Sequence, residues 1–267
     1  MASSKRLSKS RKISPEVNGS LFPESEKDGQ GADVRLSPSD YFEEFYRLRT
    51  WTPFDFQREM LAAMESGYHG LLNAPTGSGK TYAAWIPFIS CWMARHPDYA
   101  ENPGKGLKLI WITPLRALAR DISEALQVAC DAFDLPWRVE TRTGDTSPQV
   151  KKEQIKRMPE ALITTPESLH VLLARKGNPK LFKDLEAIVV DEWHELIGSK
   201  RGVQVELGLS RLRAMRPELM TWGISATIGN LVQSMEVLVG PAMDQDRCTV
   251  VKADFEKKLE MITLMPT

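Results

Sequence analysis

The stretch NAPTGSGKT at residues 73–81 constrains this 267-residue chain more than any other. It follows a short apolar run and precedes a helical pattern. Gly77 and Gly79 permit backbone angles that turn successive N–H groups inward as a nest for an anion. The helix that follows adds the positive end of its dipole. Ala74 replaces the usual first glycine of the pattern, but the later glycines, which the nest needs most, remain. We therefore predict a phosphate-binding loop.

A second polar motif ends another apolar run, AIVVDEWHE at residues 187–195. Because parallel strands bring their C-terminal ends to one edge of a sheet, this motif is expected to face the loop. Lys80 would then reach the β- and γ-phosphates of ATP, and Thr81 with Asp191 would hold Mg²⁺. Glu192 would orient and deprotonate the attacking water. A zinc-protease pattern, H-E-x-x-H, is excluded because its second histidine position is Gly198.

The distribution of apolar runs predicts the fold class. Strand-like runs at 107–113, 160–165, 185–192 and 220–227 alternate with amphipathic stretches at 115–133, 149–158 and 203–215. Strands alternating with helices form a parallel sheet covered on both faces. We predict an α/β domain over residues 37–255, with a mostly parallel sheet.

Composition limits the partners and the compartment. The 35 basic and 35 acidic residues cancel, so any nucleic-acid binding must come from placed groups and not from bulk charge. The three cysteines form no C-x-x-C, which argues against disulfides, zinc and iron–sulfur clusters and favours a cytoplasmic location. No apolar run approaches the roughly 18 residues of a membrane span. Residues 1–36 are Ser- and Lys-rich and predict a disordered tail, which is either solvated, a weak nucleic-acid arm or a targeting sequence.

Two segments repeat one arrangement, an apolar strand followed by Thr-Pro and a helix: IWITPLRAL and LITTPESL. Thr113 and Thr165 suit the N-cap, and Pro114 and Pro166 suit the first helical position. Each segment would present a helix N-terminus with free N–H donors at the same sheet edge. Two such ends can bind successive phosphates of one strand, and Arg116 adds a charge.

Asp-Glu-Trp-His at 191–194, together with the loop, resembles motifs II and I of the superfamily 2 DExH-box helicases. Five further stations resemble the family in order: TPFDFQREML (52–61), TPLRALA (113–119), TGDTS (143–147), TTPES (164–168) and SAT (225–227). The resemblance implies a RecA-like P-loop NTPase domain, with His194 joining the catalytic set of Lys80, Asp191 and Glu192. The residues that it implies for the nucleotide are Gln57, Thr76, Gly77, Ser78, Gly79, Lys80 and Thr81. Those that it implies for nucleic acid are Thr113, Pro114, Arg116, Thr143, Gly144, Asp145, Thr165 and Glu167.

The resemblance also implies that Ser225 and Thr227 bond the Asp-Glu-x-His turn and couple the two sites. The run DEWHELIGSKRGVQVEL (191–207) is similar to Lhr-type helicases, especially the DNA-ligase-associated bacterial branch. Lys200 and Arg201 either contact nucleic acid there or belong to a solvated turn.

The Lhr-type resemblance implies 3′-to-5′ movement on single-stranded DNA, and opening of duplex DNA or RNA–DNA hybrids in DNA repair. An ATP-dependent DNA ligase and a nuclease would be partners at the bacterial nucleoid, with no membrane association.

The resemblance covers the first of two RecA-like domains, so residues 256–267 are expected to begin the crossover to the second. That domain carries the arginine fingers of the family, so this chain should bind ATP and nucleic acid but turn over slowly. The alternatives are an RNA-directed DExH helicase domain, a non-catalytic fragment that binds nucleic acid or a partner, and, least supported, a P-loop ATPase that is not a helicase.

Overall fold

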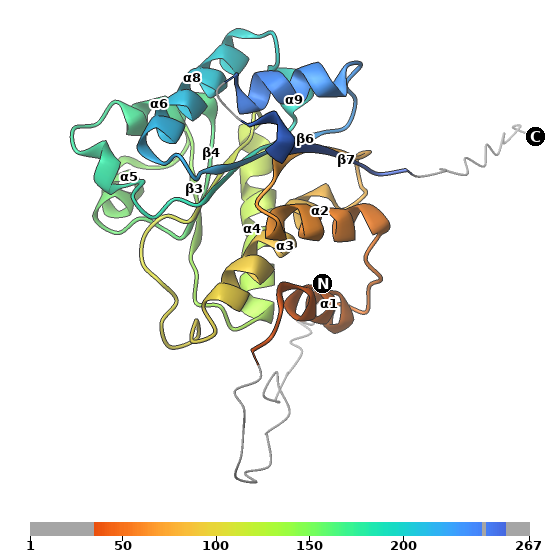
Figure 1. The fold of residues 1–267 in the computed structure, drawn as a ribbon. Helices are drawn as coiled ribbons and strands as arrows, with labels where there is room; N and C mark the ends of the chain where they lie inside the picture. Colours follow the sequence, from red (N-terminus) through yellow and green to blue (C-terminus); the bar gives the residue numbers. More distant parts are fainter. Residues whose placement is uncertain (1–34, 242–243, 255–267) are drawn as a thin grey trace, which may run out of the picture. The chain divides into compact units, whose positions relative to one another are not determined.

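The fold is built on one parallel sheet (Figure 1). The computed structural model describes residues 35–241 and 244–254. Within them seven strands pair in the order β3-β4-β2-β5-β6-β1-β7, all parallel. They are β1 (His69–Asn73), β2 (Leu109–Ile112), β3 (Val139–Arg142), β4 (Ala161–Thr164), β5 (Ala187–Val190), β6 (Met220–Ser225) and β7 (Cys248–Lys252). The predicted RecA-like α/β sheet is confirmed.

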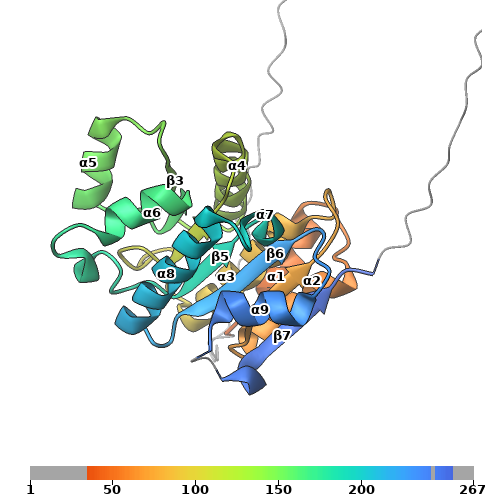
Figure 2. The ribbon, with the colours of Figure 1, turned by 90° about the horizontal axis from the view of Figure 1, so that it is seen from above.

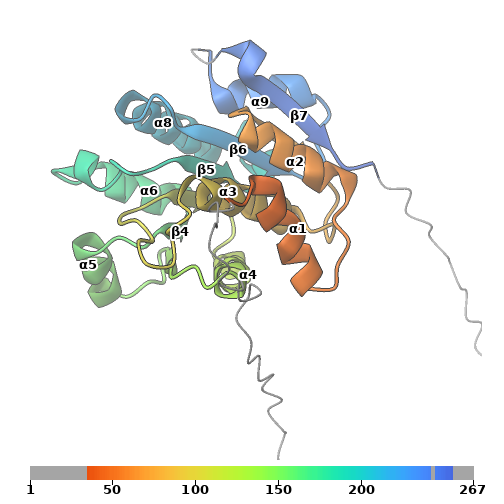
Figure 3. The same cartoon turned by 60° about the horizontal axis from the view of Figure 1, so that its bottom comes forward.

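Alternate strand residues face two separate cores. Leu109 and Trp111 of β2 belong to the core under α1 (Pro38–Leu48), α2 (Asp55–Glu65), α3 (Lys80–Arg95) and α4 (Arg116–Ala132). Ile110 and Ile112 belong to the core under α6 (Pro166–Leu173), α7 (Trp193–Leu196), α8 (Lys200–Met215) and α9 (Leu231–Val239). Figures 2 and 3 show these two helix sets on opposite faces of the sheet. Burial on both faces explains why the inner strands read as continuous apolar runs.

The strand register brings the predicted motifs to one edge. Asn73 pairs with Ser225, Ile112 with both Val190 and Thr164, and Thr164 in turn with Arg142. Each of these residues is the last of its strand. The phosphate loop, the Asp-Glu-x-His turn and the other motifs therefore all start from the same sheet edge, as the sequence predicts.

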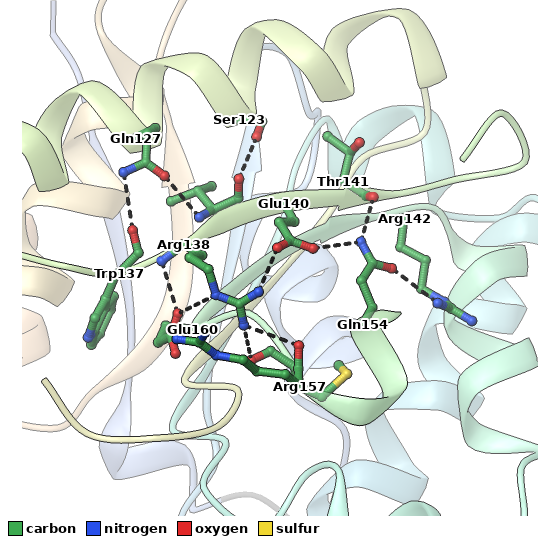
Figure 4. Close-up of polar contacts among 12 residues, drawn as sticks. Ser123, Gln127, Trp137, Arg138, Glu140, Thr141, Arg142, Gln154, Arg157 and Glu160 are labelled. Atoms are coloured by element: carbon green, nitrogen blue, oxygen red, sulfur yellow. Dashed lines mark hydrogen bonds and ion pairs between the residues drawn. The ribbon is translucent and has the colours of Figure 1, made fainter. Parts of the chain in front are cut away.

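The outer strand β3 was not predicted, because its sequence Val-Glu-Thr-Arg carries no apolar run. Side chains of α4 and α5 (Pro148–Lys156) form hydrogen bonds with backbone N–H and C=O groups along the outer edge of β3 (Figure 4). The Val139 N–H donates to Gln127 Oε1 at 3.0 Å, and Ser123 Oγ donates to the Val139 carbonyl at 3.2 Å. Gln154 Nε2 donates to the Thr141 carbonyl at 3.1 Å. An edge strand covered in this way is protected from pairing with another chain.

The remaining described elements are short. Turns of 3-10 helix cover Asn178–Lys180 and Gln245–Arg247, and the second leads into the other unpredicted edge strand, β7. Most of the predicted tail, and the predicted crossover at 256–267, lie outside the described residues. Leu36, at the end of that tail, packs against the core. Among the described residues, no helix is both long and apolar enough to cross a membrane.

Candidate nucleotide and nucleic-acid sites

The phosphate loop has the backbone that its glycines predict. Gly77 and Gly79 take left-handed φ values of 79° and 83°. Gly79 is the N-cap of α3, and no side chain caps that helix. The first-turn N–H groups of α3 are therefore directed at the loop without a side-chain acceptor, which is the geometry that binds a phosphate.

A chain of polar contacts links the loop to the neighbouring strands. Lys80 Nζ lies 3.4 Å from Glu192 Oε1, and Glu192 Oε2 lies 3.4 Å from His194 Nδ1. The same His194 nitrogen lies 3.2 Å from Ser225 Oγ. Glu192 has a φ of 47°, an uncommon left-handed value for a residue with a side chain. Such backbone strain often occurs at functional sites, and here it directs Glu192 at Lys80.

Asp191 is the buried acid of this site, with 7% of its surface exposed. Its Oδ1 accepts from the Glu192 N–H at 2.9 Å, and its Oδ2 accepts from Trp111 Nε1 at 3.4 Å. Burial, together with the nearby Glu192 carboxylate, raises the pKa of Asp191 to about 6. The nearby Lys80 ammonium only partly offsets these effects, and a divalent cation can supply further positive charge to the two carboxylates.

No group of three or more His, Cys, Asp or Glu side chains that could hold a metal occurs among the described residues. A cation here would need the Thr81 hydroxyl and phosphate oxygens in addition to Asp191. Such sparse protein ligation is typical of Mg²⁺ bound with a nucleotide.

Two residues that contact this site were not predicted from the sequence. Trp111 lies inside a strand and looks like core, yet its indole N–H bonds Asp191. Asn73 Nδ2 donates to the carbonyls of Ser225 and Ala226 at 3.4 Å each, which ties the start of the phosphate loop to the end of β6. Asn73 carried a signal, because a polar amide ends an otherwise apolar strand directly before the loop.

Gln57 is 3% exposed, and its amide is engaged on both sides. Its Oε1 accepts from the Phe54 N–H at 2.9 Å, and its Nε2 lies 3.4 Å from the Gly79 carbonyl. Gln57 thus joins the start of α2 to the phosphate loop. Its role in reading adenine remains a prediction.

The two Thr-Pro segments differ. Thr165 is the N-cap of α6, its Oγ1 accepts from the Ser168 N–H at 3.4 Å, and Pro166 is the first helical residue. Thr113 is not a cap: α4 begins at Arg116 with Leu115 as its N-cap. The prediction that Thr113 caps this helix and that Pro114 is its first residue was therefore wrong.

The segment before α4 makes two contacts that the local pattern does not predict. Arg201 Nη1 donates to the Pro114 carbonyl at 2.8 Å, and Thr113 Oγ1 accepts from the Leu115 N–H at 3.4 Å. Leu115 keeps an extended backbone, with φ −108° and ψ 114°, and the first turn of α4 forms two residues later than predicted.

The TGD loop after β3 is held by its own side chains. The Thr143 N–H donates to Thr146 Oγ1 at 3.0 Å, and the Asp145 N–H donates to Thr143 Oγ1 at 3.2 Å. Arg116 Nη1 lies 3.4 Å from Asp145 Oδ1. A Cβ at Gly144 would lie 2.7 Å from the Arg116 guanidinium carbon, so glycine lets this side chain lie across the loop. Arg116, Thr143 and Asp145 also line a groove of about 930 Å³ between α4, β3 and α5.

The predicted coupling pair is only half formed. Ser225 contacts His194 as expected. Thr227 is exposed and has no hydrogen-bond partner among the described residues, because β6 ends at Ser225 and the chain turns outward. The prediction that Thr227 bonds the Asp-Glu-x-His turn was wrong.

A phosphate loop facing an Asp-Glu-x-His turn across a parallel sheet defines a RecA-like P-loop domain. Residues 54–235 match the DEAD/DEAH box helicase family, and the chain belongs to that family. It is 33% identical to the ATP-dependent helicase Lhr-Core of Methanothermobacter thermautotrophicus over 234 residues, which are 84% of this chain and 27% of the relative. It is 30% identical to the Lhr helicase/probable uracil glycosylase of Mycolicibacterium smegmatis, covering 86% of this chain and 16% of the relative.

Solved structures agree with this assignment. The structure of Mycobacterium smegmatis helicase Lhr bound to ssDNA and AMP-PNP superposes with a TM-score of 0.69 and 29% identity, over 82% of this chain and 28% of that one. The DEAD-box helicase Mss116 bound to ssRNA shares the fold, with a TM-score of 0.67, 20% identity and coverage of 81% of this chain and 45% of that one. The chain spans about a quarter or less of the Lhr-type relatives that it matches.

Proposed function

We propose that this chain is the ATP-binding motor domain of a superfamily 2, Lhr-like helicase that couples ATP hydrolysis to movement on single-stranded DNA. One observation carries the proposal. The contacts of Glu192 with Lys80 and with His194, beside the buried Asp191, lie at the same sheet edge as the segments after β2 and β4. A nucleotide and a nucleic-acid strand bound there would be neighbours.

The proposed roles follow from the positions of the side chains. Residues 76–79 and the start of α3 bind phosphates through backbone N–H groups, and Lys80 adds its charge to the γ-phosphate. Thr81 and Asp191 hold Mg²⁺, which would neutralise phosphate charge. Glu192 orients the attacking water and accepts its proton. When ATP binds, Lys80 exchanges its contact with Glu192 for one with the γ-phosphate.

For nucleic acid, we propose that backbone donors near Thr113, Pro114, Thr143, Gly144 and Thr165 bind phosphates, with Arg116, Asp145 and Glu167 beside them. The open N-terminus of α4 supports this, since no side chain caps it. Ser225, through His194, connects this edge to Glu192. The residue types do not separate DNA from RNA, because phosphates are common to both.

The wider proposal rests on the Lhr-type similarity. It comprises 3′-to-5′ movement, opening of duplex DNA or RNA–DNA hybrids, and a role in DNA repair with an ATP-dependent DNA ligase and a nuclease at the bacterial nucleoid. A second RecA-like domain would supply arginine fingers, which are worth roughly 10³ to 10⁵ in turnover. We therefore expect slow turnover from this chain alone and faster turnover when that domain is added.

The first test is binding of a fluorescent ATP analogue with Mg²⁺, followed by ATP turnover with and without single-stranded DNA. Lys80→Ala should weaken nucleotide binding, and Glu192→Gln should keep binding but reduce turnover by at least about 100-fold, as expected for loss of a general base. Lys152→Ala, an exposed lysine on α5, is the matched control and should change neither. Unchanged nucleotide binding in Lys80→Ala would refute the site.

Parallel titrations with DNA and RNA strands of one sequence address the substrate. Tighter binding of DNA supports the proposal, and tighter binding of RNA favours an RNA-directed helicase. DNA binding without any turnover, even after the second domain is added, would support a non-catalytic fragment.

A further inference from the structure

Arg201 lies at the sheet edge that is proposed to bind nucleic acid. Three segments meet there: the residues after β2, the first turn of α6 and the first turn of α8. Arg201 is in the first turn of α8. Its Nη1 donates to the Pro114 carbonyl at 2.8 Å, while its Nε and Nη2 contact the two oxygens of Glu167 at 2.7 and 3.3 Å. One planar guanidinium thus joins the segment after β2 to the first turn of α6. A fork of this shape can make both contacts at once, whereas a lysine ammonium cannot hold the same geometry.

The position of Arg201 is fixed from the nucleotide side. Ser199 Oγ donates to the Leu196 carbonyl at 2.6 Å and accepts from the Gly202 N–H at 3.1 Å. A Cβ at Gly202 would overlap the Leu196 backbone oxygen, so only glycine lets α8 start this close to α7. α7 directly follows Glu192 and contains His194. The position of Arg201 therefore depends on the close junction of α7 and α8, residues 196–202, which follows the Asp-Glu-x-His turn.

Glu167 is an unexpected side chain for a phosphate-binding edge. Partial burial raises the pKa of Glu167, but hydrogen bonds from Arg201, from its own backbone and from Thr165 outweigh that effect, and the pKa lies below its usual value. A free carboxylate in this place would repel a phosphate. The Arg201 contact cancels that charge and gives the carboxylate a structural use.

We propose that Arg201 and Glu167 form a brace that fixes the spacing between the segment at 113–115 and the start of α6. Because Leu115 leads directly into α4, the brace would hold the uncapped first turn of α4, whose N–H groups have no side-chain acceptor, in place beside the start of α6 for a phosphate of the strand. Arg201 is a positioning residue here: each of its three guanidinium nitrogens already contacts a protein oxygen. This inference rests on the proposed nucleic-acid binding.

Glu167→Gln gives a test in which the two explanations predict opposite signs. If Glu167 only places a negative charge near the strand, its removal should tighten DNA binding. If it holds the brace, its removal should weaken DNA binding, roughly three- to tenfold, as expected for loss of a coupled pair. The measurement is fluorescence anisotropy of a labelled oligo(dT) with the full chain at fixed salt. Equal or tighter binding by Glu167→Gln would overturn the brace.

Arg201 variants separate a brace from a direct phosphate contact. Arg201→Lys keeps the charge but loses the fork, so it should bind DNA as weakly as Arg201→Gln. Wild-type affinity in Arg201→Lys would show that charge alone matters and would overturn the proposal. The double variant should bind no more weakly than Arg201→Gln alone, because both changes remove one brace. Arg211→Gln, an exposed arginine on the same helix, is the matched control and should bind normally.

The same samples are titrated with the fluorescent ATP analogue, which the brace variants should bind with wild-type affinity. Arg201 and Glu167 have 38% and 45% of their side chains exposed, so the variants are expected to fold, and thermal melting checks this. A wild-type chain that binds the analogue but no DNA would overturn both the nucleic-acid function and the brace. A wild-type chain that binds both, with Glu167→Gln unchanged, would overturn the brace alone.

Discussion

The starts of α4 and α6 share a Thr-Pro sequence after a buried strand, yet they are built differently. At α6 the local prediction is sufficient: Thr165 caps the helix, and Pro166 is its first residue. At α4 the helix begins two residues after the proline and has no side-chain cap. Thr113 is fully buried, and its backbone N–H donates to the Thr164 carbonyl at 2.9 Å, which continues the sheet beyond β2.

The difference shows what decides where a helix starts when the local sequence allows two answers. The Pro114 carbonyl would accept from the first turn of a helix that began there. In the structure it accepts from Arg201, 87 residues further along the chain, and Leu115 after it is extended and not helical. The capped start is closed by its own side chain, and the uncapped start is open because its N-cap residue, Leu115, has no side-chain acceptor. An open start is the better phosphate site, since its first-turn N–H groups have no side-chain acceptor.

Gly202→Ala should have the largest effect on stability, because it disturbs the close junction of α7 and α8 that places Arg201 beside Pro114. Alanine is normally favoured over glycine in a helix by about 1 kcal/mol. Here the added Cβ would overlap the Leu196 backbone oxygen, and we expect a net loss of at least about 2 kcal/mol in the free energy of unfolding. Urea unfolding of the full chain measures it.

Gly208→Ala in the same helix is the control. Its Cβ would lie 3.2 Å from a movable Leu169 methyl and not from a backbone atom, so the change should be small. Equal stability of Gly202→Ala and Gly208→Ala would mean that the junction of α7 and α8 has room for a Cβ at position 202.

Removing the two threonine hydroxyls compares the helix starts directly. Thr165→Val deletes a cap and should lower the free energy of unfolding by about 1 kcal/mol. Thr113→Val deletes a hydroxyl that contacts the backbone of Leu115 at 3.4 Å but caps no helix, and it should cost less than about half of that. Thermal or urea unfolding of both variants decides, and a larger loss at Thr113 would show that the two starts are more alike than their geometry indicates.

The same contrast explains how far the sequence could predict the molecule. The inner strands are buried on both faces, so their apolar runs predicted the sheet, and β1, β2, β4, β5 and β6 follow from them. The edge strands β3 and β7 did not, because Val-Glu-Thr-Arg and Cys-Thr-Val-Val-Lys are only half buried. The contacts that stabilise β3 come from glutamines on neighbouring helices, and no local pattern reveals them.

For the site, glycine chemistry and the position of Asp191 at a strand end predicted which groups meet at the edge. What could not be predicted was contact across the fold. The indole of Trp111 on Asp191, and Arg201 between Pro114 and Glu167, depend on how separate segments pack. The prediction for Thr227 was wrong for a similar reason. β6 ends two residues before Thr227, and the motif in the sequence does not mark that boundary.

Adding a cap at the open start tests whether α4 truly begins at Arg116. Leu115 has the extended backbone of an N-cap, with φ −108° and ψ 114°, and is 45% exposed. Leu115→Ser should therefore be more stable than Leu115→Ala by about 0.5–1 kcal/mol, because only serine can accept from the first turn. The comparison with alanine corrects for the lost leucine surface. Identical stability of the two variants would place the start of α4 elsewhere.

The smallest expected effect is the pH dependence of the brace at the capped start. The pKa of Glu167 is lowered in the folded chain, chiefly because its hydrogen bonds outweigh the effect of partial burial. The stability that the ionised form contributes is therefore present above the unfolded pKa, near the ordinary value of 4.5, and is lost as pH falls through the folded value. Because the pair is more than one-third exposed, we expect only a few tenths of a kcal/mol, roughly the worth of a surface ion pair.

Comparing wild type with Glu167→Gln between pH 7 and pH 3.5 isolates this contribution from the other carboxylates. The stability gap between the two should narrow below about pH 4.5. In an Arg201→Gln background the stability gap should be smaller throughout. The hydrogen bond from Arg201, which lowers the pKa of Glu167 more than the other hydrogen bonds do, is then gone. A gap that stays constant, or that widens in acid, would mean that Arg201 does not stabilise the carboxylate. The closed start of α6 would then depend on Thr165 alone.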